Sequence, residues 1–471
     1  MSIENPPPID RLGALRRAGF RSRSVREELR GNLLARLRAG EPLFEGILGY
    51  DDTVVPAVEN ALLCGHDLIF LGERGQAKTR MIRQLTRLLD PWLPVVAGSE
   101  IHDDPFAPVS AQARRLVAER GDDTPVGWVH RDDRYVEKLA TPDVSIADLI
   151  GDVDPVRVAE GRSLGDELTI HFGLLPRTHR GIFCINELPD LTEKVQVGLF
   201  NVMQERDVQV KGYRVRLPLD VLVVASANPE DYTSRGRIIT PLKDRYAAQI
   251  RTHYPASRAL ELAVVRQEAR PPQAPGVVAW MPAFLEEVVA ELTLEARRSP
   301  DVNQTSGVSV RMSIANYETL LANAVRRALR FGEPEAVPRV SDLEALLAST
   351  AGKLELEYSG TERSEGDVVR DLVRRAVKTV FDAAVPLEGI AAVLDAFEQG
   401  WQVEVSAQMP SGEYLTGLDQ IPGLRDAAAR LAGGDSPARL ASAIEFVLEG
   451  LHLGNRLNKS EAEGRARYAR R

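Results

Sequence analysis

Residues 68–79 read LIFLGERGQAKT, and this stretch decides the fold that we expect. The apolar run Leu68–Leu71 predicts a buried strand, because strands covered on both faces are continuously apolar. Apolar residues then recur at helical spacing over residues 81–89, which predicts a helix after the loop. The order strand, glycine-containing loop, helix is typical of a phosphate-binding loop, although Ala77 stands where a glycine usually precedes the lysine.

The loop contains the residue types that phosphate binding requires. Small residues let backbone N–H groups turn toward phosphate oxygens, and the following helix directs its positive end at them. Lys78 supplies a cation for the β and γ phosphates, and Thr79 supplies a hydroxyl for Mg²⁺. We therefore expect a nucleoside triphosphate to bind the loop residues Gly72, Glu73, Arg74, Gly75, Gln76, Ala77, Lys78 and Thr79.

A second apolar run, Gly181–Ile185, ends in the polar pair Asn186 and Glu187. Nucleotide hydrolases place a metal-side group and a water-activating base at the carboxyl end of a strand, and Glu187 is the candidate base. Asn186 stands where an aspartate is usual. Its carbonyl oxygen can hold a metal-bound water, but it lacks the charge, so we expect weaker Mg²⁺ binding.

A third apolar run, Val221–Ala225, leads to Asn228, whose amide is in position to orient the attacking water. Between the second and third runs, residues 208–217 alternate around Lys211 and Gly212, which predicts a β-hairpin. Apolar strands that alternate with helices predict a parallel sheet with helices on both faces, an α/β fold.

The flanking regions are mostly helical in pattern. Residues 24–39 predict a helix, and the pattern beyond His253 is helical nearly throughout, with short strands expected near Gln402–Val405. The arginine-rich stretches 11–38 and 456–471 predict solvated helix faces or chain ends, with contact to a partner subunit as the alternative. Cys64 and Cys184 lie in or beside apolar runs, so we expect both thiols to be buried.

The composition is that of a soluble globular protein, since 44% of the 471 residues are apolar and 27% are charged. No apolar run has the length that a bilayer-spanning helix needs, and residues 1–10 contain no apolar signal core. We therefore expect a cytoplasmic protein without a membrane partner. The net charge of −9 argues against general affinity for nucleic acid, although it is compatible with a local basic patch.

Residues 43–330 resemble the AAA+ ATPases of the MoxR and magnesium-chelatase branch. The segments that carry the resemblance are GERGQAKT from residue 72, HRGIFCINELPDL from 179, VQVGLFNVMQERDVQV from 195, ASANPED from 225, LKDR from 242 and VSVR from 308. The alanine before the lysine is similar to the MoxR form of the loop. Residues 95–108 and 148–151, followed by 173–181, are similar to the ATPase subunit of magnesium chelatase.

The resemblance implies ATP as the nucleotide and a role for each motif. Lys78 and Thr79 would form the first nucleotide motif, Asn186 and Glu187 the second, and Asn228 the first sensor. Arg245 would be the finger that reaches the γ-phosphate of a neighbouring subunit, and Arg311 would be the second sensor. Leu48 and Gly49 would lie on the adenine side, while residues 208–217 and the region around 158–172 would be the two insertions of this clade.

The resemblance also implies an organisation in four parts. These are a basic helical extension (1–40), an αβ ATPase core (41–254), a helical lid (255–335) and a mostly helical region of unknown role (336–471). The implied function is an Mg²⁺-dependent ATPase that assembles with itself into a hexameric ring and remodels a partner protein bearing a von Willebrand factor A domain.

Two other functions stay open at this point. In the first, ATP orders the ring as a nucleotide-gated scaffold, and Asn186 leaves hydrolysis negligible. The second is a DNA-acting AAA+ protein, which the negative net charge and the lack of a helix-turn-helix pattern disfavour.

Overall fold

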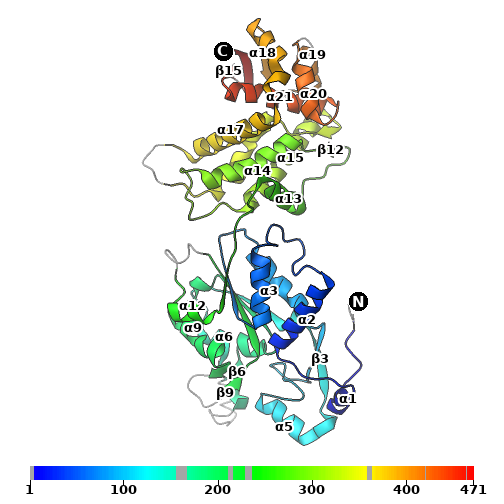
Figure 1. Ribbon diagram of the computed structural model, residues 1–471, viewed down its shortest axis with the longest axis vertical. Coiled ribbons are helices and arrows are strands. Elements are labelled where there is room, and N and C mark those ends of the chain that lie inside the picture. Colours follow the sequence, from blue (N-terminus) through cyan, green and yellow to red (C-terminus); the bar gives the residue numbers. More distant parts are fainter. Residues whose placement is uncertain are drawn as a thin grey trace. The chain divides into compact units, whose positions relative to one another are not determined.

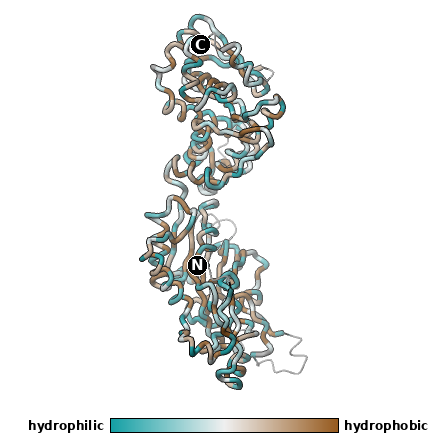
Figure 2. Tube along the Cα trace, turned by 90° about the vertical axis from the view of Figure 1, so that its right-hand side faces the viewer, coloured by the Kyte–Doolittle hydropathy of each residue, from teal (hydrophilic) through white to brown (hydrophobic). Residues whose placement is uncertain are grey.

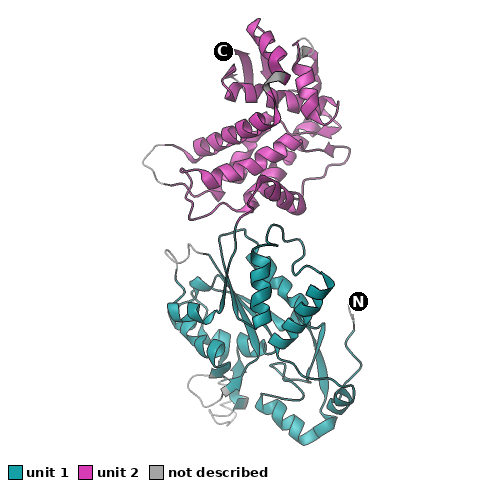
Figure 3. Ribbon diagram, viewed as in Figure 1, with its two compact units in different colours: residues 1–253 teal, residues 254–471 magenta. Residues whose placement is uncertain are grey.

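The computed structural model describes residues 5–154, 167–209, 216–228, 236–357, 363–418, 421–462 and 464–471. The chain divides into two compact units, residues 1–253 (unit 1) and 254–471 (unit 2), drawn in teal and magenta in Figure 3. Apolar and polar residues are interspersed along the trace of both units (Figure 2). Among the described residues, no helix is long and apolar enough to cross a membrane.

Unit 1 is the blue to green part of the ribbon in Figure 1. It is built on a five-stranded parallel sheet with the order β11-β1-β10-β7-β4. The strands are β1 (Leu68–Leu71), β4 (Tyr135–Leu139), β7 (Gly181–Asn186), β10 (Val221–Ala227) and β11 (Ala248–Arg251). The three runs expected to be strands form β1, β7 and β10 and are buried throughout, which confirms the α/β fold. The strand order reverses at β1, and α/β sheets bind ligands at the carboxyl edge beside such a reversal.

Alternate residues of the sheet face two separate hydrophobic cores. Phe70, Cys184 and Val224 pack on one face, with helices α2, α3 and α4, while Phe183 and Val223 pack on the other, with α9, α10 and α12. The helices are α2 (Val25–Ala39), α3 (Val54–Cys64), α4 (Lys78–Gln84), α9 (Glu193–Gly198), α10 (Phe200–Gln204) and α12 (Thr240–Arg245). The expected helix over residues 24–39 is confirmed as α2, which begins with a capping box between Ser24 and Glu27.

Shorter elements surround this sheet. They are α1 (Leu12–Arg17), β2 (Trp92–Val96), α5 (Ala111–Arg120), β3 (Val126–His130), α6 (Ile146–Ile150), β5 (Gly151–Val153), β6 (Ile170–Phe172) and α8 (Leu174–Arg177). The expected hairpin is confirmed at its base by the antiparallel pair β8 (Asp207–Gln209) and β9 (Arg216–Pro218). Its tip, with Lys211 and Gly212, lies outside the described residues, as do residues 158–166 of the second expected insertion.

The two cysteines differ in exposure. Cys184 in β7 is buried as expected, and its burial raises the pKa of the thiol to about 12. The expectation for Cys64 is wrong, because this thiol is exposed. Cys64 is the last residue of α3, whose buried face is formed by Val54, Val58, Ala61 and Leu62. An apolar run at a helix end therefore did not imply burial of its final residue.

Unit 2 is mostly helical, as expected. Its helices include α13 (Arg258–Glu268), α14 (Ala283–Arg298), α15 (Val310–Phe331), α16 (Leu347–Thr350), α17 (Glu365–Ala384), α18 (Ala391–Glu398), α19 (Ser411–Leu418), α20 (Leu424–Ala432) and α21 (Pro437–Leu453). A small antiparallel sheet has the order β14-β16-β15, with β14 (Val403–Val405) where a strand was expected, β15 (Leu457–Ala462) and β16 (Arg465–Arg470). A second, parallel pair joins β12 (Val278–Ala279) and β13 (Glu335–Ala336).

One hydrophobic core runs through unit 2, from Met281 to Tyr468. At its centre, Gly450 of α21 lets the ring of Phe381 of α17 approach so closely that a Cβ atom there would lie 2.0 Å from the ring. Residues 255–335 and 336–471 therefore share their packing, and residues 25–33 likewise pack into unit 1. The organisation in four parts stays a prediction about roles.

Candidate functional site

The phosphate loop, residues 72–79, begins where β1 ends at the reversal of the sheet. The Gly72 N–H donates to the carbonyl of Ala227 in β10 (3.2 Å), and the Thr252 N–H donates to the carbonyl of Leu71 (2.9 Å). The Thr252 hydroxyl donates to Oε1 of Gln76 (2.5 Å). A Cβ atom on Gly72 would lie 1.9 Å from the Thr252 hydroxyl oxygen, so only glycine fits at the start of the loop.

The loop turns twice through left-handed backbone conformations. Gly75 has φ 78°, which glycine adopts without strain, and Ala77 has φ 57°, which costs an L-residue about 1–2 kcal/mol. The structure therefore places Ala77 in a conformation that favours glycine. The strain is stored in the residue directly before Lys78 and α4.

Lys78 is buried, and its ammonium group donates to the carbonyls of Gly72 and, at 2.8 Å, of Glu73. Its side chain thus folds back over the loop in which phosphate is expected to bind. The backbone carbonyls supply hydrogen-bond acceptors to this buried ammonium in the absence of a phosphate. Thr79, the next residue, is half-buried in the first turn of α4.

The expected adenine-side segment is joined to the loop by Tyr50. Its buried hydroxyl lies 2.7 Å from the carbonyl oxygen of His253 and 3.1 Å from that of Gln76. Burial raises the pKa of Tyr50 to about 12, so the hydroxyl keeps its proton. Leu48 and Gly49 directly precede this anchor, and Leu48 is exposed. No pattern in the sequence indicated a role for Thr252, which is evident only from its contacts beside the loop.

Asn186, at the end of β7, is engaged on both sides of its amide. Its Nδ2 donates to the carboxylate of Glu137 in β4, and its Oδ1 accepts from the Ser226 hydroxyl at 3.0 Å. Glu137 also accepts two hydrogen bonds from the Arg83 guanidinium of α4, at 2.7 and 3.0 Å. These bonds, above all those from Arg83, hold the pKa of Glu137 below its usual range.

Glu187 follows Asn186 with φ 55° and ψ 49°, a left-handed conformation that is rare for a glutamate. Its backbone N–H donates to the Ser226 hydroxyl at 3.2 Å. The side chain is half-buried at the carboxyl edge of the sheet. Unusual backbone at such an edge is compatible with the expected role of Glu187 as the base, because strain collects where a side chain must be aimed.

Asn228, at the end of β10, has an amide without a partner. Its residue is 1% exposed, and neither its nitrogen nor its oxygen makes a hydrogen bond to any described residue. An unpaired buried amide costs about 1–3 kcal/mol, so such groups usually await a ligand or water. Asn228 follows Ala227, which binds Gly72, and therefore lies beside the phosphate loop.

Arg245 and Arg311 are the two arginines that were predicted to complete the site. Arg245, at the end of α12, stacks over the ring of Phe200 (4.3 Å) and donates to the side chain of Gln204 (2.7 Å). Arg311 lies exposed in the first turn of α15, in unit 2. The roles of both stay predictions.

The residues of the loop edge fit a nucleotide. The buried Lys78 ammonium and the unpaired Asn228 amide are groups that phosphate oxygens and an attacking water require. Among the described residues, no group of three or more His, Cys, Asp or Glu side chains could hold a metal ion. Thr79 and Asn186 stay predictions as the residues that would hold Mg²⁺ on the protein side, with the nucleotide's phosphates as its other ligands.

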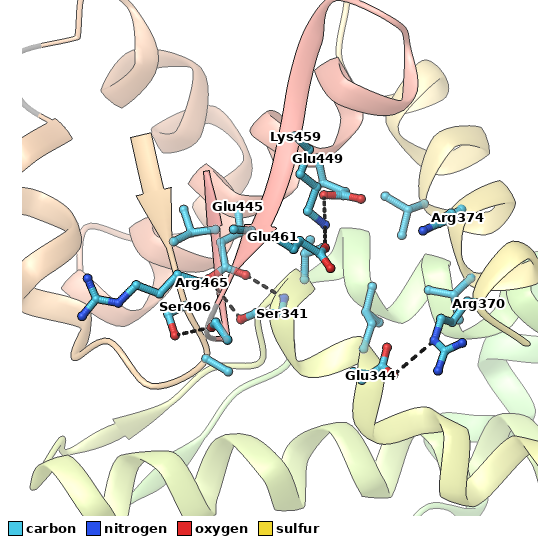
Figure 4. Close-up of a pocket in the computed structure, with 18 of the residues that line it drawn as sticks. Ser341, Glu344, Arg370, Arg374, Ser406, Glu445, Glu449, Lys459, Glu461 and Arg465 are labelled. Atoms are coloured by element: carbon cyan, nitrogen blue, oxygen red, sulfur yellow. Dashed lines mark hydrogen bonds and ion pairs between the residues drawn. The ribbon is translucent and has the colours of Figure 1, made fainter. Parts of the chain in front are cut away.

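The described residues also line two hollows to which no residue of the loop contributes. In unit 1, a cavity of about 470 Å³ lies between Arg23, Arg26, Arg180, Arg206, Asp104 and Asp220. In unit 2, a cavity of about 550 Å³ lies between α17, α21 and the β15–β16 hairpin (Figure 4). Its charges pair with each other: Lys459 binds Glu449 (3.0 Å) and Glu461 (2.8 Å). Glu445 accepts from the Ser341 N–H at 2.7 Å. We assign no role to either hollow.

Residues 164–243 match the sigma-54 interaction domain family. This segment includes β7, β10, Asn186, Glu187 and Asn228. The chain is also similar to the chaperone MoxR1 of Mycobacterium tuberculosis, with 33% identity over 90 residues, or 19% of this chain. The match spans 23% of the length of MoxR1. Over the matched residues, the chain is thus distantly related to AAA+ ATPases, among them MoxR1.

Solved structures with a similar fold include the complex between subunits BchI and BchD of magnesium chelatase, with 22% identity, a TM-score of 0.32 and coverage of 64% of this chain and 92% of that one. A putative ATPase from Cytophaga hutchinsonii has 16% identity and a TM-score of 0.29, with coverage of 74% and 96%. NtrX from Brucella abortus has 15% identity and a TM-score of 0.37, with coverage of 77% and 68%.

Proposed function

We propose that this chain binds ATP with Mg²⁺ at the phosphate loop, hydrolyses it in a hexameric ring of identical subunits and uses the energy to remodel a partner protein. A partner with a von Willebrand factor A domain is the one that the resemblance to MoxR-like proteins implies. The observation that carries the proposal is the convergence of three features at one edge of the sheet. They are the buried Lys78 ammonium, the unpaired Asn228 amide and Glu187 in its left-handed conformation.

Each of these residues has a part in hydrolysis. Lys78 would leave its loop carbonyls for the β and γ phosphates and stabilise the charge that develops there. The Asn228 amide would orient the attacking water, and Glu187 would accept its proton. Mg²⁺, when bound with ATP, supplies positive charge to the phosphate oxygens. Arg245 of a neighbouring subunit would reach the γ-phosphate, for which it would leave Phe200 and Gln204.

The first experiment compares Lys78→Ala with the parent in steady-state phosphate release and in binding of a fluorescent ATP analogue. We expect Lys78→Ala to lose detectable binding and hydrolysis, because the charge that meets the phosphates is gone. Lys194→Ala is the matched control, since Lys194 is an exposed lysine on α9 of the same unit. Unchanged binding and turnover in Lys78→Ala would refute the phosphate-loop assignment.

A second experiment tests the ring. Arg245→Ala and Lys78→Ala subunits are mixed, and their assembly is followed by mass photometry. Mixed rings contain interfaces in which an intact loop faces an intact Arg245, so part of the activity should return. Mixed rings without any recovery would count against a role for Arg245 across the subunit boundary.

One observation favours the nucleotide-gated scaffold as a second candidate. Both sides of the Asn186 amide are occupied by Glu137 and Ser226, so Asn186 offers little to a metal-bound water. A parent that binds ATP and assembles but releases phosphate at background rate, with the partner protein present, would support the scaffold.

The match of residues 164–243 to the sigma-54 interaction domain favours a sigma factor as an alternative remodelled partner. A pull-down with ATP-loaded rings would test this alternative.

A further inference from the structure

We propose that Glu137 is a positioning residue of the hydrolysis site, which acts through Asn186 and Ser226 to hold the backbone of Glu187 in place. The inference rests on the proposed function, because it concerns the rate of ATP hydrolysis. Neither Glu137 nor Ser226 was predicted to have a role from the sequence. What joins them is a chain of hydrogen bonds that crosses three neighbouring strands, β4, β7 and β10.

The chain starts at a carboxylate that only accepts hydrogen bonds. Glu137 lies on β4 opposite Cys184 of β7, on the face of the sheet that α4 covers. Arg83 donates to both of its oxygens, and Tyr135 donates from its hydroxyl at 3.0 Å. A carboxylate held by a guanidinium fork has a fixed position, so it presents a fixed acceptor to its remaining neighbour. That neighbour is Asn186.

The carboxylate decides which way the Asn186 amide lies. Glu137 cannot donate, so the Nδ2 group of Asn186 faces it and the Oδ1 atom faces Ser226. The Ser226 hydroxyl has one proton, which it donates to Oδ1. Its lone pairs are then free to accept from the Glu187 N–H at 3.2 Å. Each hydrogen bond in the chain therefore takes its direction from Glu137.

The last bond of this chain acts on the candidate base. A left-handed backbone costs an L-residue about 1–2 kcal/mol, and the bond from the Glu187 N–H to Ser226 helps to hold it. The first bonds of the chain come from Arg83, on the helix that begins with Lys78. The network thus connects the helix of the phosphate loop with the backbone that aims Glu187.

The network also gives a reason for an asparagine at position 186. An aspartate there would bring a second carboxylate against Glu137, with two acceptors and no proton between them. We therefore expect Asn186→Asp alone to impair hydrolysis, even though it introduces the carboxylate that is usual at this position. If the amide is placed at position 137 and the carboxylate at position 186, the hydrogen bond between the two side chains should form again, and hydrolysis should recover.

The experiment measures kcat and the affinity for a fluorescent ATP analogue in Glu137→Ala, Glu137→Gln, Asn186→Asp and the double variant Glu137→Gln/Asn186→Asp. We expect kcat to fall about 30-fold in Glu137→Ala and in Asn186→Asp, because misplacement of a catalytic group by a fraction of an ångström has effects of this order. Glu137→Gln should lose only about threefold, because its Oε1 atom can still accept from Asn186. Nucleotide affinity should stay within about twofold of the parent in all four, since binding depends on the loop.

The double variant is the decisive measurement. The amide introduced at position 137 would donate to the carboxylate introduced at position 186, so the hydrogen bond returns with its polarity reversed. We expect kcat to recover to within about threefold of the parent. A merely structural role for Glu137 predicts no such rescue, because both substitutions keep the size of the side chain. Asp122→Asn is the matched control, since it breaks the exposed ion pair with Arg16 in the same unit.

Each outcome has a definite meaning. A double variant no faster than Asn186→Asp, or a Glu137→Ala variant as fast as a hydrolysing parent, overturns the inference alone. An Asp122→Asn variant that slows hydrolysis as much as Asn186→Asp also overturns it. A parent whose phosphate release equals that of Lys78→Ala overturns hydrolysis as the proposed function, and the inference with it. If Glu137→Ala does not fold, the comparison of Asn186→Asp with the double variant Glu137→Gln/Asn186→Asp tests the inference.

Discussion

The two ends of the same five strands are built in opposite ways. At the amino ends, charged side chains are buried in ion pairs. Arg134, directly before β4, is fully buried and makes a two-pronged ion pair with Glu28 of α2, at 2.8 and 2.6 Å. Asp67, directly before β1, accepts from Arg26 (2.8 Å) and from the Val223 N–H (2.9 Å).

At the carboxyl ends, the structure leaves groups unpaired and backbone strained. The Asn228 amide has no partner among the described residues, and Ala77 and Glu187 have positive φ. These features cost stability, whereas breaking one of the buried ion pairs at the amino ends would leave a buried charge without its partner. The difference teaches that one end of the sheet holds α2 and the strands together, while the other is left ready for a ligand. Substitutions at the carboxyl ends should therefore change mainly the rate of hydrolysis, and substitutions at the amino ends should change mainly the stability of unit 1.

The largest effect is expected at the carboxyl ends. If Glu187 accepts the proton of the attacking water, Glu187→Gln should lower the rate of hydrolysis by roughly two to four powers of ten and leave ATP binding and stability intact. Phosphate release, analogue binding and thermal unfolding measure the three properties. Glu193→Gln, an exposed glutamate on α9, should change none of them. If Glu187→Gln lowered the stability as much as the rate, in free-energy terms, the proposed difference between the two ends of the sheet would be wrong.

The next effect is at the amino ends. Glu28→Ala leaves the buried Arg134 guanidinium without its anion and should cost unit 1 about 3–5 kcal/mol. Amide hydrogen exchange of peptides from β7 and β10 measures the free energy of unfolding of unit 1 separately from that of unit 2. The double variant Glu28→Met/Arg134→Met removes both charges and should recover most of the loss. A double variant as unstable as Glu28→Ala would show that the charges themselves do not cause it.

A smaller effect at the same end should depend on pH. His179 is buried, and desolvation together with the nearby Arg180 lowers its pKa to about 4; its Nδ1 accepts from the Asp220 N–H (3.0 Å). Because the unfolded chain binds the proton more readily, stability is full above the unfolded pKa near 6.5 and falls as the pH drops toward the folded pKa of about 4. Between pH 7 and 5 the loss should be about 2 kcal/mol.

The control for this prediction is His179→Asn, whose Oδ1 can take over the bond from Asp220 without a titrating ring. Hydrogen exchange of unit 1 at both pH values should show most of the pH dependence in the parent and little in His179→Asn. An equal pH dependence in both proteins would assign it to other groups.

The smallest effect sharpens the view that the loop stores strain. Ala77→Gly should stabilise unit 1 by about 1 kcal/mol or less, because relief of the left-handed strain exceeds the added chain entropy. Ala61→Gly, in the interior of α3, should instead destabilise by about 1 kcal/mol. Thermal unfolding of the two variants compares them. A destabilised Ala77→Gly would mean that the loop at this residue is not strained.

The sequence by itself determined the centre of unit 1. The runs at β1, β7 and β10 are buried on both faces and are therefore continuously apolar. The residue types at Gly72 and Lys78 by themselves indicate a phosphate-binding loop. Strands β4 and β11 escaped prediction because they are edge strands, whose half-exposed residues give no apolar run. Cys64 was misjudged for a related reason, since burial at a helix end depends on the neighbouring elements.

Only the tertiary structure decided how the polar groups of the site are connected. Glu137 became a candidate because the register of β4 on β7 brings its carboxylate to the Asn186 amide, although the two residues lie 49 positions apart in the chain. The pairing of Arg134 with Glu28 and the isolation of the Asn228 amide arise in the same way. The physical reason is that burial of apolar runs is a local property of a sequence. The direction and partner of a hydrogen bond depend on atoms that folding brings together from distant segments.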